Sequence, residues 1–215
     1  MPNSRLARRK LIHGSLALAG TSWLLGPQGR AENTLSPTPQ QTPGPFYPFS
    51  FPQNSDNDLV HVSGHSGPTK GLVTRITGLI LDRNGRPISG AQIEVWQCDA
   101  NGRYHYVRDD RTDRPGDDNF QGYGTTTTNV GGANQFLTIK RVPYPGRTPH
   151  IHFAVSGRGV ERFITQMYVA GEPRNAADPV LMGVRDAAAR DRLIVASSQS
   201  RGPAVLAGEF DIVLG

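Results

Sequence analysis

The chain contains little cysteine and no long apolar run. Its 215 residues include one cysteine, Cys98, so an internal disulfide is excluded. The most apolar stretch, around Leu16 to Leu25, is short and is interrupted by glycine, serine and threonine, so no stable membrane anchor is expected. The fold must therefore be stabilised by a hydrophobic core rather than by covalent cross-links.

The chain also lacks an excess of positive charge outside its N-terminus. The formal net charge is +5, from 23 basic and 18 acidic residues. The first 31 residues hold five of the basic residues and none of the acidic ones, which leaves 18 residues of each sign in the remainder. A basic surface for nucleic acid or for a membrane is therefore not expected on the body of the protein.

Residues 1–31 have the pattern of a twin-arginine export signal. Arg8 and Arg9 open the segment, the short apolar run follows, and Gly29-Arg30-Ala31 is suitable for cleavage. We expect a periplasmic or otherwise exported protein. Because twin-arginine substrates are carried across the membrane already folded, this route is compatible with a cofactor inserted before export.

The mature part of the chain is expected to be rich in β-structure. The 25 glycines and 17 prolines of the full chain indicate many turns. Short β-rich segments separated by turn signals occupy residues 72–81, 91–97, 135–140, 151–155, 163–169 and 209–214. Only residues 179–195 have a helical pattern. We predict an all-β fold, with a single β-sandwich domain over residues 72–215, long loops and one minor C-terminal helix, preceded by an irregular arm over residues 32–71.

The most informative segment runs from Pro143 to His152. It contains a phenol, Tyr144, a guanidinium, Arg147, and two imidazoles, one of them His150. Side chains two residues apart on a strand point to the same face, so an extended His-Ile-His places both imidazoles side by side. Such a pair is suited to bind one metal ion through two neighbouring coordination positions.

The tyrosines narrow the choice of metal. Tyr104, which follows an Asn-Gly turn, and Tyr144 would add two phenols to His150 and His152. Phenolate is a hard ligand that suits a trivalent ion, and such an ion lowers the tyrosine pKa. Zinc sites use histidine, cysteine and carboxylate instead, and a copper or zinc site on the two histidines would leave both tyrosines unexplained. Fe(III) is the metal that the full set favours.

Each of these residues also has an ordinary structural interpretation. Tyr104 can be a packed cross-strand aromatic, Tyr144 can cap a turn, Arg147 can be a solvated loop cation, and Gln166 can be a polar strand residue. The remaining histidines, His61, His65 and His105, match no ligand motif, and Cys98 reads as a small buried residue.

The sequence resembles the intradiol ring-cleaving dioxygenases over residues 42 to 214. The matching motifs, in order, are Thr42-Pro43-Gly44-Pro45-Phe46-Tyr47, Val95-Trp96-Gln97-Cys98-Asp99-Ala100-Asn101-Gly102-Arg103-Tyr104, Asn119-Phe120-Gln121-Gly122, Tyr144 with Arg147-Thr148-Pro149-His150-Ile151-His152-Phe153, Ile164-Thr165-Gln166-Met167-Tyr168 and Phe210-Asp211-Ile212-Val213-Leu214. Each motif alone is weak, but six in the same order are specific. The chain is most similar in kind to compact exported members and to the protocatechuate-cleaving branch.

This resemblance implies a site and an activity. Tyr104, Tyr144, His150 and His152 would ligate Fe(III), with Tyr144 and His152 as the axial pair. Arg147 would lie over the substrate ring and stabilise its developing charge. The resemblance further implies that Gln166 is a substrate-side or supporting glutamine and that Trp96 packs near the Tyr104 phenolate. The enzyme would cleave a catechol or protocatechuate between its hydroxyl-bearing carbons with O2, giving a cis,cis-muconate.

Some features depart from the family pattern or stay open. The spacing between Tyr144 and His150 is short, which predicts an open substrate pocket. The space before the first strand is too small for the helical dimerisation domain of catechol-type members, and both a homo-oligomer and a hetero-oligomer stay open. The candidates for binding an acidic ring substituent, which the sequence does not rank, are Arg103, Arg108 and Arg141.

A non-catalytic alternative has support in the sequence as well. The segment from Gly78 to Val95, a strand, a turn and a second strand, is typical of periplasmic transthyretin-like binding sandwiches. Metal content separates this alternative from the enzyme.

Overall fold

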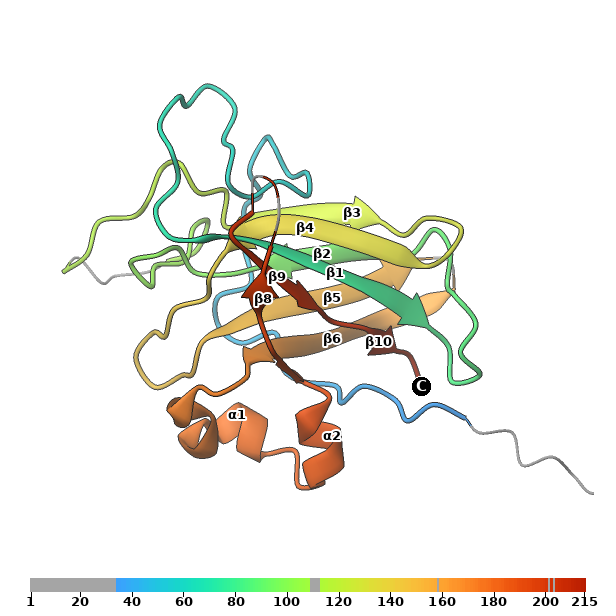
Figure 1. Ribbon diagram of the computed structural model, residues 1–215. Helices are drawn as coiled ribbons and strands as arrows, with labels where there is room; N and C mark the ends of the chain where they lie inside the picture. The colour runs from blue at the N-terminus through green and yellow to red at the C-terminus, as the bar shows by residue number, and fades with distance from the viewer. Residues whose placement is uncertain (1–33, 109–112, 158, 201, 203) are drawn as a thin grey trace, which may run out of the picture. The chain divides into compact units, whose positions relative to one another are not determined.

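The protein is described by a computed structural model that covers residues 34–108, 113–157, 159–200, 202 and 204–215. The expected export signal lies outside these residues. Two five-stranded sheets pack face to face, with short helices beyond one edge (Figure 1). The elements are β1 Val73–Leu81, β2 Gln92–Trp96, β3 Tyr123–Thr127, β4 Ala133–Ile139, β5 His150–Gly157, β6 Val160–Val169, η1 Pro173–Ala177, α1 Pro179–Met182, α2 Ala187–Asp191, β7 Ile194–Val195, β8 Ser198–Gln199, β9 Leu206–Glu209 and β10 Ile212–Val213. The prediction of an all-β sandwich is confirmed.

The first sheet is organised around β1. This strand pairs antiparallel with β4 and parallel with β9 and β10, and β8 extends the sheet beyond β9. Gly78 of β1 lies beside Phe210, where the chain crosses from β9 to β10. A side-chain carbon at Gly78 would lie 1.9 Å from the carbonyl oxygen of Phe210. A glycine is therefore required for this close approach of two backbones.

The second sheet carries the candidate site and has the strand order β3-β2-β5-β6-β7. Strand alternation directs Ile151, Phe153 and Val155 of β5 into the core between the sheets, where all three are buried. Burial of a side chain of this size contributes about 1.5–3 kcal/mol. The same alternation directs His150 and His152 to the opposite face of the sheet.

Several segments differ from the sequence prediction, which placed one strand over residues 209–214 where the structure has β9 and β10, and none at β8. The expected helix over residues 179–195 is divided into α1 and α2, because the chain turns at Gly183 and Asp186 caps a new helix through the backbone N–H of Ala189. Ile194 then joins β7. The strand β3 was not predicted, since its Thr-rich sequence has no alternating apolar pattern and depends on pairing with β2.

The N-terminal arm closes one side of the sandwich. The Thr38 N–H donates to the carbonyl of Val213 in the first sheet, and the Gln41 N–H donates to the carbonyl of Ile164 in the second. Over residues 34–71 the arm forms no helix or strand, apart from a single bridge at Asp58. It runs along the part of the β6 edge that β7 does not cover, and then crosses the outer face of the second sheet (Figure 1). The arm thereby becomes one wall of the candidate site.

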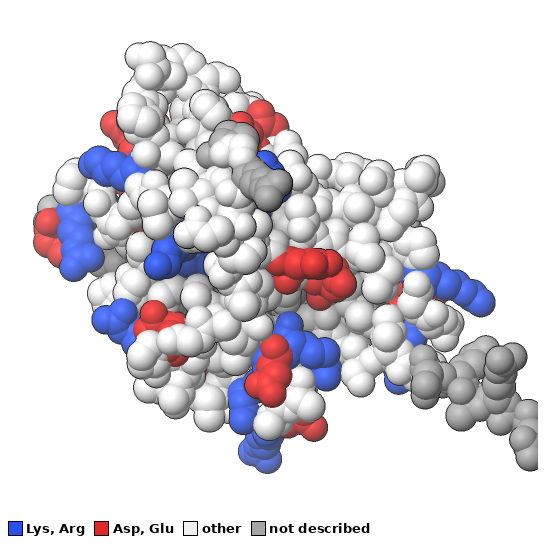
Figure 2. Space-filling view, in the orientation of Figure 1, with Lys and Arg blue, Asp and Glu red and all other residues white. Residues whose placement is uncertain are grey.

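Among the described residues, no helix has the length and apolarity needed to cross a membrane. Basic and acidic side chains are interspersed on the face shown in Figure 2, and neither sign forms an extended patch on the described part of that face. This face therefore has no extended region of a single charge sign among the described residues.

Candidate metal and substrate site

Two imidazoles form the centre of the site. His150 and His152 are each 1% exposed, and their Nε2 atoms lie 3.1 Å apart. The Nδ1 atom of His150 lies 2.6 Å from the carbonyl oxygen of Thr148. A carbonyl only accepts hydrogen bonds, so Nδ1 carries the proton and Nε2 has a free lone pair directed at its neighbour. A cation between the two nitrogens would satisfy both.

The histidines are held in the neutral form that a metal ion requires. Burial and the nearby Arg147 guanidinium lower the pKa of His150 to about 4. Burial, the neighbouring His150 and Arg147 lower the pKa of His152 well below its usual value. The ring of His152 stacks on Trp96 with a centroid distance of 4.7 Å and an interplanar angle of 6°. Trp96 also belongs to the buried cluster that contains Tyr104, as expected, and it therefore packs near two of the proposed ligands.

Two tyrosines complete the ring cluster. Tyr104 follows a turn in which the Asp99 carboxylate accepts the N–H groups of Asn101 and Arg103. Its ring lies 5.5 Å from that of Tyr144, measured between centroids, and 6.2 Å from that of His152. The ring of Tyr144 in turn lies 5.4 Å from that of His150. The structure thus brings all four predicted ligands into one cluster, although they come from three separate segments.

The chemistry of this donor set fits a trivalent ion. The described residues contain no group of three or more histidine, cysteine, aspartate or glutamate side chains suited to a metal. Burial raises the pKa of Tyr144, and the positive charge of Arg147 opposes this shift only in part. A phenolate at this position therefore needs additional positive charge, which Fe(III) supplies better than a divalent ion.

Arg147 is fixed by polar contacts on several sides. Its Nε donates to Asp178 at 2.8 Å and its Nη2 donates to the Gln166 side-chain oxygen at 2.6 Å. Weaker contacts reach the hydroxyls of Tyr144 at 3.4 Å and Tyr168 at 3.3 Å. The guanidinium is thus oriented before any substrate binds, with its charge directed toward one of the predicted metal ligands.

Asp178 and Tyr168 are site residues that the sequence analysis missed. Asp178 caps α1 by accepting the N–H groups of Val180 and Leu181, and it also accepts the N–H of Thr148. Although burial raises the pKa of this carboxyl, the bond from Arg147 and these N–H groups hold it below its usual range. An Asp-Pro pair at a helix start signals the cap, but nothing in the sequence links it to Arg147.

Gln166 connects the sheet to the arm. It lies opposite His152 in the pairing of β5 with β6 and is fully buried. Its oxygen accepts from Arg147, while its Nε2 donates to the Thr42 carbonyl at 2.9 Å. The predicted supporting glutamine therefore contacts both the loop that carries the arginine and the arm that covers the site.

Two cavities share the loop from Tyr144 to Arg147 as a common wall. One, of about 600 Å³, is otherwise lined by the arm and α1, mainly through Pro45, Phe46 and Val180. The other, of about 460 Å³, is lined instead by charged side chains, Arg114 and Arg174 among them. An apolar chamber and a polar one thus lie next to the same pair of functional groups.

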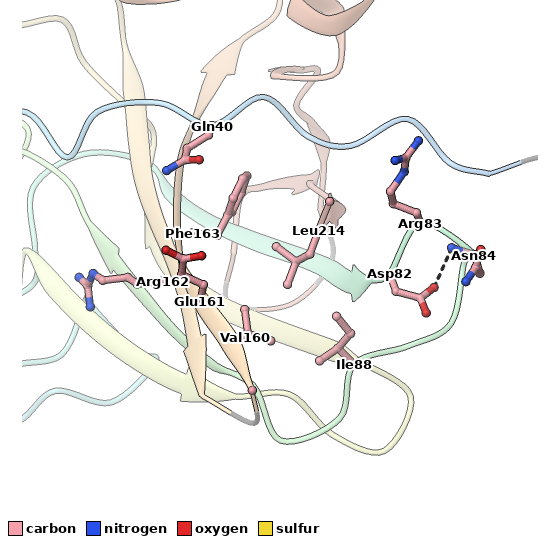
Figure 3. Close-up of a pocket in the computed structure, with 12 residues that line it drawn as sticks. Gln40, Asp82, Arg83, Asn84, Ile88, Val160, Glu161, Arg162, Phe163 and Leu214 are labelled. Atoms are coloured by element: carbon pink, nitrogen blue, oxygen red, sulfur yellow. Dashed lines mark hydrogen bonds between the residues drawn. The ribbon is translucent and has the colours of Figure 1, made fainter.

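The arginines suggested by the sequence for an acidic substituent lie elsewhere. Arg141 is buried and donates to the Ser197 hydroxyl, and Arg103 donates to the carbonyl of Arg114. Neither residue, nor Arg108, lines these two cavities. Another cavity, of about 640 Å³, has an apolar floor that includes Ile88, Phe163 and Leu214 (Figure 3). None of the predicted site residues lines it, so it is separate from the histidine and tyrosine cluster.

A family model described as dioxygenase matches residues 43–215. The chain is 43% identical to the protocatechuate 3,4-dioxygenase beta chain of Burkholderia cepacia, over 74% of this chain and 71% of the relative. It is 28% identical to hydroxyquinol 1,2-dioxygenase of Corynebacterium glutamicum over 66% of this chain, but spans only 50% of that relative.

A solved structure supports the same relationship. The dioxygenase domain of a dioxygenase and carbohydrate-binding protein fusion from Streptomyces sp. SirexAA-E superposes with a TM-score of 0.64 at 31% identity. The superposition covers 83% of this chain and 98% of that domain. The likeness thus extends over most of this chain, and the residues that the family model matches include the strand that carries the two histidines.

Proposed function

This chain belongs to the intradiol ring-cleaving dioxygenases, and from that premise we propose that it is a non-haem Fe(III) enzyme that opens the ring of a catechol or protocatechuate. The ring would be cleaved between the two hydroxyl-bearing carbons with O2, to give a cis,cis-muconate. One observation carries the proposal: the Nε2 atoms of His150 and His152 converge beside the rings of Tyr104 and Tyr144.

These four side chains would hold the metal. An Fe(III) ion held there would supply a Lewis acid that both oxygens of a deprotonated catechol can chelate and that activates the ring toward O2. The Thr148 carbonyl keeps His150 in the tautomer that presents Nε2. Trp96 restricts rotation of the His152 ring by stacking on it. The protein thus presents two nitrogen ligands whose orientation is set before the metal arrives.

The loop from Tyr144 to Arg147 would handle protons and charge. Tyr144 lines both cavities. In its phenolate form, the Tyr144 oxygen can accept a proton from a substrate hydroxyl. The Arg147 guanidinium lies 3.4 Å from this oxygen and favours its ionised form. The same positive charge would stabilise negative charge that develops on the ring. Asp178 and Gln166 hold the guanidinium at this position.

The two cavities differ in polarity, so they are suited to different parts of the substrate. The apolar chamber lined by Pro45, Phe46 and Val180 is suited to an aromatic ring. The neighbouring chamber lined by Arg114 and Arg174 is suited to an acidic substituent such as the carboxylate of protocatechuate. The short loop from Tyr144 to Arg147 lines both chambers, so each chamber lies next to the Tyr144 hydroxyl and the Arg147 guanidinium.

We further propose that residues 1–31 direct export to the periplasm or beyond, on the basis of the twin-arginine pattern alone. The relative from Burkholderia cepacia is named as a beta chain, which implies that it assembles with another chain. Whether the present chain forms a homo-oligomer or a hetero-oligomer can be decided by light scattering of the purified mature protein.

The proposal is tested by metal reconstitution of the purified chain. Protein loaded with Fe(III) is expected to be coloured by tyrosinate charge transfer, to change its absorption when catechol is added without O2, and to consume one O2 per ring opened. Protein loaded with Zn(II) serves as the control and stays colourless and inactive. A colourless iron protein, or one that binds catechol without consuming O2, would favour the non-catalytic binding module instead.

A further inference from the structure

A buried carboxylate on β2 collects hydrogen bonds from three different segments. Glu94 is 5% exposed, and its Oε2 accepts the hydroxyl of Tyr47 at 2.6 Å and that of Tyr123 at 3.2 Å. Arg162 of β6 donates to the same carboxylate through both terminal nitrogens. Arg162 also lines the cavity drawn in Figure 3, where its side chain extends away from Leu214. The carboxylate is therefore satisfied, although it takes no part in the proposed chemistry.

One of these donors belongs to the N-terminal arm. Tyr47 packs edge-on against Trp96 with a centroid distance of 5.0 Å, and the Arg162 guanidinium lies 5.0 Å from the centre of its ring. Burial and the adjacent Glu94 carboxylate raise the pKa of Tyr47, so its hydroxyl remains a donor. Tyr47 thus fixes this part of the arm through contacts of its ring and of its hydroxyl.

The residues just before Tyr47 lie directly on the metal site. Phe46 stacks on Tyr104 with a centroid distance of 4.8 Å and an angle of 15°, and it meets the ring of Tyr144 edge-on at 5.5 Å. Gly44 adopts a φ of +68°, and a side-chain carbon there would lie 3.5 Å from Cε1 of His152. The arm therefore packs on both proposed tyrosine ligands and passes close to His152.

The other end of this segment is tied through Gln166, which donates to the Thr42 carbonyl. The arm segment from Thr42 to Tyr47 is thus fastened at both ends, and Phe46 lies between the two attachments. A segment without helix or strand relies on such attachments for its order. If the Tyr47 attachment is lost, the face of the site formed by the two tyrosines loses its packing partner.

We propose that Glu94 is a positioning residue that clamps the arm segment Thr42–Tyr47 over the ligand cluster by accepting the Tyr47 hydroxyl. The carboxylate contacts neither metal nor substrate. It acts by holding Phe46 against the two tyrosines and Tyr47 against Trp96, which stacks on His152. The consequence for metal retention and substrate binding rests on the proposed function, whereas the ordering of the arm does not.

The chain offers a matched pair of variants for the test. Tyr47→Phe and Tyr123→Phe each remove one hydroxyl that donates to the same Glu94 oxygen, but Tyr47 belongs to the arm and Tyr123 to β3. Amide hydrogen exchange of Gly44, Phe46 and Tyr47 is measured on the metal-free protein. Tyr47→Phe is expected to accelerate this exchange about tenfold, and Tyr123→Phe is expected to change it less than twofold. Equal acceleration in both variants, or none in Tyr47→Phe, would overturn the clamp.

Glu94→Gln provides an independent variant, because it keeps the size of the side chain but removes the charge. It should accelerate arm exchange at least as much as Tyr47→Phe. With iron-loaded protein, Tyr47→Phe should release the metal to a chelator several-fold faster and raise KM for catechol more than it lowers kcat. Unchanged release alongside faster arm exchange would refute the effect on the ligands. A wild-type chain that fails to retain iron would refute the proposed function, while exchange in the metal-free protein still decides the clamp.

Discussion

The Arg147 guanidinium and the Asp178 carboxylate meet at 2.8 Å, although 31 residues separate them in the sequence. The arginine side chain is 10% exposed and the aspartate side chain is fully buried. The same carboxylate caps α1, so a helix start and a site arginine share one negative charge. The short helices after β6 are thereby coupled to the loop that precedes β5.

This coupling predicts that Asp178→Asn costs more than the loss of a helix cap. Removing one partner of a buried ion pair leaves an uncompensated charge, so we expect a loss of about 3–5 kcal/mol in the free energy of unfolding, measured by urea titration. Asp186→Asn is the control, because the Asp186 carboxylate caps α2 by accepting the N–H of Ala189 and asparagine caps a helix about as well as aspartate, so it should cost less than about 0.5 kcal/mol. Equal losses in the two variants would mean that the ion pair contributes nothing beyond the cap.

The two candidate tyrosine ligands are expected to differ in their effects. Tyr104→Phe should weaken iron retention and bleach the visible band of the loaded protein. Tyr144→Phe should keep part of the colour but slow catechol binding, since Tyr144 lines both cavities and lies beside Arg147. Absorption spectra and stopped-flow mixing with catechol without O2 measure both effects. An identical and complete loss of colour in both variants would contradict these separate roles.

Arg174 is predicted to affect acidic substrates selectively. It lines the polar chamber and is exposed, so its charge is screened and Arg174→Gln should raise KM for protocatechuate only about threefold while leaving KM for catechol unchanged. Arg185→Gln removes an equally exposed charge outside both chambers and should change neither constant. If Arg174→Gln affects catechol and protocatechuate alike, the polar chamber does not bind the carboxylate.

Arg141 is predicted to cost stability. It is 3% exposed, only its Nη2 has a hydrogen-bond partner among the described residues, and burial lowers its pKa to about 10. Arg141→Met fills a similar volume without the charge, so we expect the free energy of unfolding to rise by about 1–3 kcal/mol. Lys140→Met, at the exposed neighbouring position, should change it by less than about 0.5 kcal/mol. A destabilised Arg141→Met variant would show that the guanidinium makes a net favourable contribution.

His150 predicts an acid-labile metal-free protein. Its folded pKa of about 4 lies below the usual value of 6.5, so the unfolded chain binds a proton that the folded chain excludes. Stability is fully present above pH 6.5 and falls as the pH decreases toward 4, by about 3 kcal/mol from this group. Urea titrations of the metal-free protein at several pH values measure the slope. His150→Gln should reduce it, and an unchanged slope would assign the acid sensitivity to other groups.

Local pattern was sufficient for much of the fold. Alternating apolar residues predicted the strands around Ile80, Val95 and Phe153, because one face of each is buried against the other sheet. The strand β3 and the division of the C-terminal helix were not predictable in this way. β3 depends on its partner β2, and the helix is interrupted by a turn at Gly183 and by the Asp186 cap, which accepts the backbone N–H of Ala189.

The proposed ligand set lies between these two cases. The spacing of His150 and His152 predicts that both face one side of a strand, and family motifs add Tyr104 and Tyr144. Neither spacing nor motif predicts that the ring of Trp96 stacks on that of His152. That contact depends on the register of β2 against β5, which places Trp96 directly opposite the histidine.

The sequence alone determined the chemistry that is available, because residue type and short spacing specify which donors share a face and which charges are present. It did not determine the supporting contacts of Asp178, Gln166 and Glu94. These side chains contact Arg147, the arm and Tyr47 across 19 to 124 residues of chain, and each bond forms only once separate strands and loops have packed. Local pattern carries no information over such separations, since long-range contacts depend on the register and packing of the whole sandwich.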